Sequence, residues 1–454
     1  MVLKLRTPFL NSIVTDLLPL LLIVATACIY FWYLGTFAVN IPQGDDIQDV
    51  LNFVSGVVKA ENWKIAVKLF FEQHNDHRTS ASRLIYYAAY VAQDEINFRT
   101  LVLVANIALP LILGLLYIRL RHHKYRWLIL LPVALLLFQL HNYNLVVWTT
   151  AAFAFFFAFL YGFCCIYALH SVTPSRFILA IVFAILANLT LASGQIIWLV
   201  GLGSLLQQGL IRKSISIRYA FFWVLFTVVD LSVWYWDFVP NKINIEVAKV
   251  IFPNNSIGAP ILESIAHQLH FFLILLGSAA SNSSAVAAVV FGAICMAVLA
   301  VVSATSYRNE DLRVEFCCWY VVLSAAAITW GRSQWLAVDY AMNPRYGFPS
   351  ILMLSLTWVL VALRIRKNPL LVLIPAVLVA GIYSITSYRT YPVLYSSFIN
   401  RYISDFNDDR YMSFEGNLSN SVHEAILLGV YKPPLRPLPL HKVDDQEQSS
   451  KQGY

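Results

Sequence analysis

Long apolar runs, separated by short polar connections, extend over most of this chain. Runs close to the length that crosses a bilayer, about 20 residues, lie near 13–37, 100–119, 127–143, 149–169, 177–192, 195–210, 219–237, 285–304, 314–331, 347–363 and 369–387. The pattern predicts an all-α polytopic membrane protein with about 11 transmembrane helices. The strands of an outer-membrane barrel would instead alternate apolar and polar residues over about ten positions.

Two short interruptions modify this topology. Residues 267–280 (HQLHFFLILLGSAA) are apolar but too short for a full span, so we expect a re-entrant or interfacial segment on the outer side. Residues 193–195 (SGQ) separate two spans with almost no loop, which indicates a tight turn at the outer surface. The first run, 13–37, is too long for a signal-peptide core, and we expect it to be retained as the first span.

Three segments are large enough to lie outside the bilayer, residues 38–99, about 238–266 and 388–454. Residues 38–99 carry apolar positions at helical spacing over 47–58 and 63–70, which predicts two amphipathic helices lying along the membrane surface. They form the first external loop of a transmembrane domain expected over residues 1–387. Residues 388–454 are expected to form an external C-terminal tail, with disorder in its Pro-rich and then charged end.

Composition and charge narrow the class of protein. Of the 454 residues, 59% are hydrophobic and 13% are charged, which excludes a soluble enzyme and a disordered chain. Basic connections at 119–126, 211–218, 307–313 and 364–367 account for much of the positive charge behind the net value of +7. Such connections collect on the cytoplasmic side of a membrane, so the charge indicates orientation rather than a nucleic-acid partner. With eleven spans, the N-terminus is then cytoplasmic and the C-terminus external.

Charged residues gather in the first external loop. Gly44 is followed by Asp45 and Asp46 at the start of the first amphipathic helix, where one helix cap would explain one aspartate but not the other. A second group of charged residues follows at Glu72, His74, Asp76, His77, Arg78 and Arg83. Arginine can bind a phosphate through two N–H groups at once, and a nearby carboxylate can act as a general base.

This second group has three interpretations. It is a solvated polar loop, an anion-binding and proton-transfer site near the membrane surface, or a metal site through His74, Asp76 and His77. The spacing of those three residues matches no strong metal-binding pattern. A divalent metal therefore stays an alternative that the sequence does not indicate.

Further candidates lie at the predicted outer ends of later spans. Arg332, Arg345 and Tyr346 flank the connection between the spans near 314–331 and 347–363. Charges at such positions are either interface anchors or pocket residues, and arginine is disfavoured in external connections. Gln195 and Trp198 follow the SGQ turn, where an aromatic ring could stack on a sugar or belong to the interfacial belt.

Several of these stretches together resemble a known family. The GDD sequence at 44–46, NDHRTSASRL at 75–84, SGQIIWLVGLGSLL at 193–206 and NPRYGFPS at 343–350 resemble the GT-C superfamily. Its members are integral-membrane glycosyltransferases that use sugars linked to polyprenyl phosphate. The nearest kin would be bacterial glucosyltransferases that decorate O-antigen or other envelope glycans. Asp76 stands where the family pattern would have glutamate.

The resemblance implies inverting transfer of a sugar on the external, periplasmic face of a bacterial inner membrane. Asp45 or Asp46 would be the catalytic base, and no cofactor is implied. The donor phosphate would bind to Arg78, Arg345, Arg83 and Arg332, and the substrates would contact His77, Asp76, Glu72, His74, Tyr346, Gln195 and Trp198. The implied partners are a polyprenyl-phosphate sugar donor, a glycan or lipid-linked acceptor and the bilayer, with a donor-synthesising transferase and a flippase as further candidates.

Three other classes of protein compete with this interpretation. A transporter or flippase of a lipid-linked glycan would carry charges along a path through the bilayer. An O-antigen polymerase or ligase would also act on lipid-linked sugars outside the membrane, but that class carries its large loop later in the chain. A non-catalytic assembly subunit is the least specific alternative.

Overall fold

The computed structural model describes residues 13–211, 213, 215–239, 261–281, 284–305, 311–333, 336–365, 368–413 and 416–441. Over these residues the regular structure is helical, apart from a small hairpin of β1 (Met412–Ser413) and β2 (Gly416–Asn417). Eight helical segments are long and apolar enough to cross a membrane: Thr15–Phe37, Phe98–Leu120, Thr149–Leu169, Ala192–Ile211, Ala285–Thr305, Arg313–Arg332, Pro344–Arg364 and Leu370–Asn407. The chain therefore folds as an all-helical, multi-pass membrane protein.

Three of these segments are one regular α-helix each, three add short π- or 3-10 turns to one α-helix, and two contain two α-helices. The regular helices are α2 (Leu18–Phe37), α6 (Phe98–Asn106), α7 (Ala108–Leu120), α10 (Thr149–Ala152), α11 (Ala158–Leu169), α13 (Ile196–Leu206), α17 (Ala285–Thr305), α18 (Arg313–Arg332), α19 (Gly347–Arg364) and α20 (Leu370–Asn407). The extensions that matter for the site are η4 (Ala192–Gln195) and η8 (Pro344–Tyr346). Helix α19 lies in the centre, buried on most of its surface and packed against α8 (Arg126–Leu137), α16 (Ile261–Gly277) and α18.

Four helices at the remaining predicted apolar runs are short or borderline as spans. They are α8, α12 (Pro174–Asn188), α14 (Arg218–Tyr235) and α16. The predicted run 127–143 becomes the twelve-residue α8, which ends before Phe138, where the backbone leaves the helical conformation. Helix α16 is longer than the expected segment 267–280 and is packed closely against α17, because an added Cβ at Gly277 would lie 2.0 Å from the backbone oxygen of Ala288.

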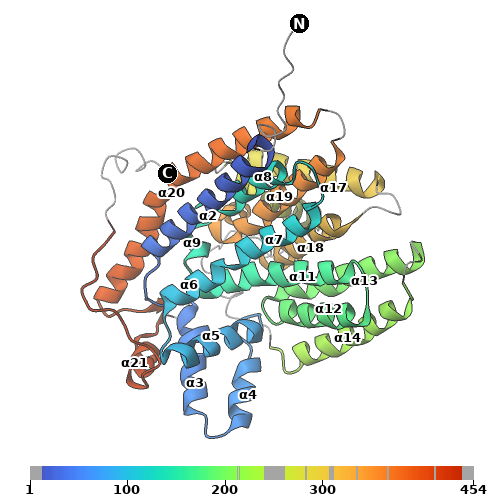
Figure 1. Cartoon of the computed structure of the whole chain (residues 1–454). Helices are drawn as coiled ribbons and strands as arrows, with labels where there is room; N and C mark the ends of the chain where they lie inside the picture. Colours follow the sequence, from blue (N-terminus) through green and yellow to red (C-terminus); the bar gives the residue numbers. More distant parts are fainter. Residues whose placement is uncertain are drawn as a thin grey trace.

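Four helical segments build the loop between the first two spans. They are η2 (Ile47–Asn52), α3 (Phe53–Lys59), α4 (Trp63–Phe71) and α5 (Ser80–Gln93), grouped at one end of the bundle in Figure 1. The two expected amphipathic helices thus differ in their burial. Val50, Leu51 and Val54 are fully buried in the protein core, whereas α4 buries none of its residues and exposes Trp63 and Val67.

The chain after the last predicted span is not a separate tail. Helix α20 continues past residue 387 to Asn407, and it buries Tyr395, Ile399 and Phe406. Helix α21 (Ser419–Leu427) then packs on η2, and Tyr431 bonds the backbone oxygen of Asn40 through its hydroxyl at 2.7 Å. The C-terminal region therefore packs against one side of the first loop (Figure 1).

The Pro-rich stretch that follows is held against α20 by hydrogen bonds. Asn400 and Asn407 of α20 each exchange two hydrogen bonds, of 2.7–3.0 Å, with the backbone of His441 and Leu438 respectively. The charged end at 442–454, for which disorder is expected, lies outside the described residues.

Candidate functional site

The GDD sequence forms a tight turn before η2. Gly44 has a φ of +51°, and an added Cβ there would lie 2.8 Å from Cζ2 of Trp148. Glycine adopts this left-handed backbone without the steric strain that other residues suffer. The turn therefore rests directly on the indole ring of Trp148, at the start of the span Thr149–Leu169.

The two aspartates of this turn have different surroundings. Asp46 is buried, and its two carboxylate oxygens accept separate backbone hydrogen bonds, from Gln43 N at 3.1 Å and Thr150 N at 2.9 Å. Burial raises the pKa of Asp46 to about 7, although both backbone donors favour the carboxylate. Asp46 thus joins the turn to the first residues of a transmembrane segment, which is a structural role.

Asp45 is half-buried, and its carboxylate has no hydrogen-bond donor among the described residues. Burial raises its pKa above the ordinary value, while His74, Arg345 and Arg332 lie near enough to favour the charged form. A carboxylate with a raised pKa and free lone pairs is suited to accept a proton near neutral pH. Of the two aspartates, Asp45 is the one available to a substrate.

Arg345 reaches this region from η8. Asn343 caps the turn by accepting the Arg345 backbone N–H at 3.0 Å, and the guanidinium donates to the Tyr346 hydroxyl at 2.9 Å. The guanidinium also lies over two aromatic rings, 5.4 Å from the centre of Trp148 and 4.9 Å from that of Tyr346. No carboxylate of the described chain lies within 4.0 Å of Arg345, so most of its donors remain available to a ligand.

These residues define what we call the GDD cluster: Asp45, His74, Trp148, Arg332, Arg345 and Tyr346. The cluster joins sequence regions that are far apart, since the first loop meets the connection between α18 and α19. Trp148 is its one member outside the sequence prediction. Its buried Nε1 has no hydrogen-bond partner within the described structure, and its place at the start of a span was the only sequence signal.

His74, a member of the cluster, and His77 close a two-residue hairpin. Each backbone N–H of the pair donates to the other's oxygen at 2.9 Å, and Asn75 between them has a φ of +49°. Burial, with the nearby Arg332, lowers the pKa of His77 to about 4, so the ring is neutral at pH 7. Asp76 belongs to the same hairpin and favours the charged form of His77.

Arg78 and Arg83 contact protein acceptors. Arg78 donates to the backbone oxygens of Phe71, Trp234 and Trp236 and to the carboxylate of Asp237, which attaches the hairpin to the end of α14. Arg83 forms a buried ion pair with Asp49 at 3.0 Å. Both arginines therefore hold parts of the fold together, and their expected contact with a donor phosphate stays a prediction.

Three other predicted contacts also lie outside the cluster. Trp198 donates from Nε1 to Asp230 at 2.8 Å, and Gln195 accepts from the Tyr235 hydroxyl at 3.2 Å, so both fasten α14 to the SGQ turn. That turn is tight, as expected, because an added Cβ at Gly194 would lie 2.0 Å from the backbone oxygen of Ala187. The side chain of Glu72 is exposed, and its backbone oxygen accepts from Arg83.

The described residues contain no group of three or more His, Cys, Asp or Glu side chains placed to hold a metal ion. Fold and site together define a multi-pass membrane protein. At one end of its helix bundle a carboxylate, Asp45, and an arginine, Arg345, lie close enough to attract each other electrostatically. Comparisons with protein-family models, with curated proteins and with solved structures found no match to this chain.

Proposed function

We propose that this protein is a GT-C-type glycosyltransferase. It would move a sugar from a polyprenyl-phosphate-linked donor to a hydroxyl group of a glycan or lipid-linked glycan acceptor. The observation that supports this most is the pairing in the GDD cluster of a carboxylate without a hydrogen-bond donor, Asp45, with an arginine without a carboxylate partner, Arg345. A proton acceptor and a phosphate-binding group are the two functions that such a transfer requires.

The proposed reaction is a single displacement. The acceptor hydroxyl oxygen attacks the anomeric carbon of the sugar, and its proton passes to the carboxylate of Asp45. The bond between the anomeric carbon and the phosphate oxygen breaks with both electrons going to oxygen, so the lipid phosphate leaves with an added negative charge. Arg345, with Arg332 nearby, stabilises that charge, and the anomeric configuration inverts.

The aromatic rings of the cluster have a positioning role in this proposal. Trp148 and Tyr346 hold the planar guanidinium of Arg345 through cation–π contacts and one hydrogen bond to the Tyr346 hydroxyl, and its other N–H groups remain for two phosphate oxygens. The unpartnered Nε1 of Trp148 is a further donor for a phosphate or sugar oxygen.

The topology that accompanies this function has eleven spans, in which α8, α12 and α14 complete the eight long segments and α16 is re-entrant or interfacial. The GDD cluster then faces the periplasm of a bacterial inner membrane, with a cytoplasmic N-terminus and an external C-terminus. Reporter fusions after residues 310 and 400 test this arrangement, because they should report opposite sides.

The proposed function is tested with Asp45→Asn. Transfer from a synthetic polyprenyl-phosphate sugar should fall about 10²–10⁴-fold, which is the usual contribution of a positioned general base. The matched control is Asp94→Asn, which makes the same change at an exposed residue of the same loop, where a φ of +54° suits asparagine.

Full activity of Asp45→Asn would remove the general-base role. Movement of the donor across vesicle membranes without any transfer product would favour the transporter instead. The role of Arg345 is tested separately by Arg345→Lys, which keeps the charge but loses the planar fork and should weaken donor binding about tenfold or more.

A further inference from the structure

A second basic site lies at the opposite end of the helix bundle. Arg313 begins α18, and Arg332 of the GDD cluster ends it. A helix of that length, 20 residues, is about 30 Å long, so the two regions are separated by roughly the thickness of a bilayer core.

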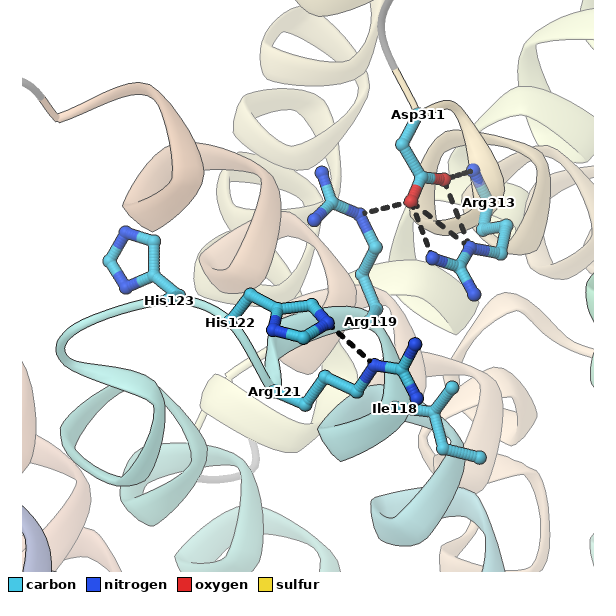
Figure 2. A pocket seen from close by; sticks show the side chains of 7 residues that line it. All are labelled: Ile118, Arg119, Arg121, His122, His123, Asp311 and Arg313. Carbon is cyan, nitrogen blue, oxygen red and sulfur yellow. Dashed lines mark hydrogen bonds and ion pairs between the residues drawn. The ribbon is translucent and has the colours of Figure 1, made fainter.

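A pocket of about 340 Å³ opens at this end, between the end of α7 and the start of α18. Figure 2 shows the side chains that line it, which are Ile118, Arg119, Arg121, His122, His123, Asp311 and Arg313. The lining carries three arginines and one aspartate, so positive charge is in excess. Burial and the nearby Arg119 lower the pKa of His123, which favours its neutral form.

Among the described lining residues Asp311 is the one carboxylate, and it already has cationic partners. Asp311 binds Arg313 from two nitrogens, at 3.0 Å and 2.6 Å, and Nε of Arg119 at 3.0 Å (Figure 2). Arg121 donates only its Nε, to His122 at 2.9 Å. The terminal nitrogens of Arg119 and Arg121 have no acceptor among the residues that the structure describes. They are donors in a partly enclosed space, which suits a phosphate.

An apolar stripe leads from this pocket along the outside of the same span. Ile107, Leu111 and Ile118 are all at least 44% exposed, and Gly114 has open space where a Cβ would be. Their spacing of four, three and four residues places them on one face of α7 and the residue before it. A headgroup phosphate in the pocket would thus continue into an acyl chain on this stripe.

We propose that this pocket binds the phosphate of an anionic phospholipid, with Arg119 and Arg121 as its ligands and the stripe of Ile107, Leu111, Gly114 and Ile118 as the path of one acyl chain. Basic pockets between transmembrane helices recognise anionic headgroups in this way. The site is independent of the proposed glycosyltransferase function and would stand if that function failed.

The test uses the full-length protein, purified in a neutral detergent and mixed with phosphatidylglycerol, and native mass spectrometry counts the retained lipid. Arg121→Gln should lower lipid affinity about fivefold and Arg119→Gln with Arg121→Gln about 25-fold, since each arginine near the surface contributes about a fivefold gain. Arg218→Gln is the matched control, because it removes an exposed arginine from another connection.

Arg121→Gln leaves the ion pair of Asp311 intact, so it remains informative even where the double variant is unstable. Retention of phosphatidylglycerol but not of phosphatidylcholine, lost in the pocket variants alone, supports the proposal. Equal retention in Arg121→Gln and the unaltered protein overturns it, as does equal loss in Arg218→Gln. Binding of inorganic phosphate in the pocket without retention of phosphatidylglycerol also overturns the lipid assignment.

Discussion

The contact between Gly44 and Trp148 leads to a quantitative prediction about the packing that supports the GDD cluster. In Gly44→Ala the new Cβ meets two separate penalties, the left-handed φ of +51° and a distance of 2.8 Å to Cζ2 of Trp148. The backbone penalty is about 1 kcal/mol, and overpacking of a buried site adds about 1–3 kcal/mol. The expected loss in the free energy of unfolding is therefore about 2–4 kcal/mol.

Two further glycines separate these penalties. Gly429 has a φ of +71° with nothing within 4 Å of an added Cβ, so Gly429→Ala measures the backbone penalty alone, about 1 kcal/mol. Gly35 lies inside α2 with no atom within 4 Å of the added Cβ, and Gly35→Ala should be neutral or stabilise by up to about 1 kcal/mol. The measurement is unfolding in mixed micelles, followed by far-UV circular dichroism.

A double-mutant cycle with Trp148→Phe isolates the contact itself. The smaller ring of phenylalanine removes part of the indole that crowds the new methyl group, so the double variant should recover about 1 kcal/mol or more relative to the sum of the single changes. The close approach would be refuted by two results together. Gly44→Ala would lower the free energy of unfolding no more than Gly429→Ala does, and the effects of Gly44→Ala and Trp148→Phe would be additive. Gly44→Ala should also weaken donor binding, because Trp148 supports Arg345.

Three further changes test the surroundings of the cluster. Arg83→Gln leaves Asp49 as a buried charge without its cationic partner. The free energy of unfolding in the same assay should fall by about 3–5 kcal/mol. A fall of less than about 1 kcal/mol would contradict the buried ion pair. His77 is neutral in the folded protein with its pKa lowered to about 4, so the unfolded chain protonates this residue first as the pH falls, and its own contribution should lower stability by about 3 kcal/mol between pH 6.5 and 4. Asp46, with its pKa raised to about 7, contributes in the opposite direction over this range, so the measurement is the difference in stability between the unaltered protein and His77→Gln at each pH. A difference that does not change with pH would disprove the prediction. The exposed pair of Lys59 and Glu424 joins the loop to α21, and Glu424→Gln should change stability by less than about 1 kcal/mol.

The long apolar runs could be predicted from the sequence because a membrane-spanning helix needs apolar side chains along its whole length. The predicted end of the last span at 387 differs from the structure for a physical reason. Polar residues such as Arg389 lower the average hydropathy there, although the buried Tyr395, Ile399, Ile403 and Phe406 repeat at helical spacing. A periodicity argument beyond residue 387 would have extended the helix.

The roles of individual site residues could not be predicted in the same way. Asp45 and Asp46 are adjacent and chemically identical, and they differ because Asp46 accepts from the backbone of Gln43 and of Thr150, which is 104 residues away. Arg78 likewise finds its acceptors in backbone oxygens of Trp234 and Trp236. Backbone acceptors exist at every residue, so the sequence contains no signal for which ones an arginine will reach.

The number of protein oxygens that accept hydrogen bonds from an arginine distinguishes structural arginines from candidate ligand-binding arginines in this protein. Arg78 and Arg83 place their donors on carbonyl and carboxylate oxygens, and so their charge is neutralised within the fold. At Arg345, which is half-buried, and at Arg121, which is exposed, the described chain offers far fewer oxygen acceptors. Guanidinium donors that the protein leaves without acceptors bind oxygens of water or of a ligand instead. Phosphate supplies several at once, and this single requirement accounts for candidate sites at both ends of α18.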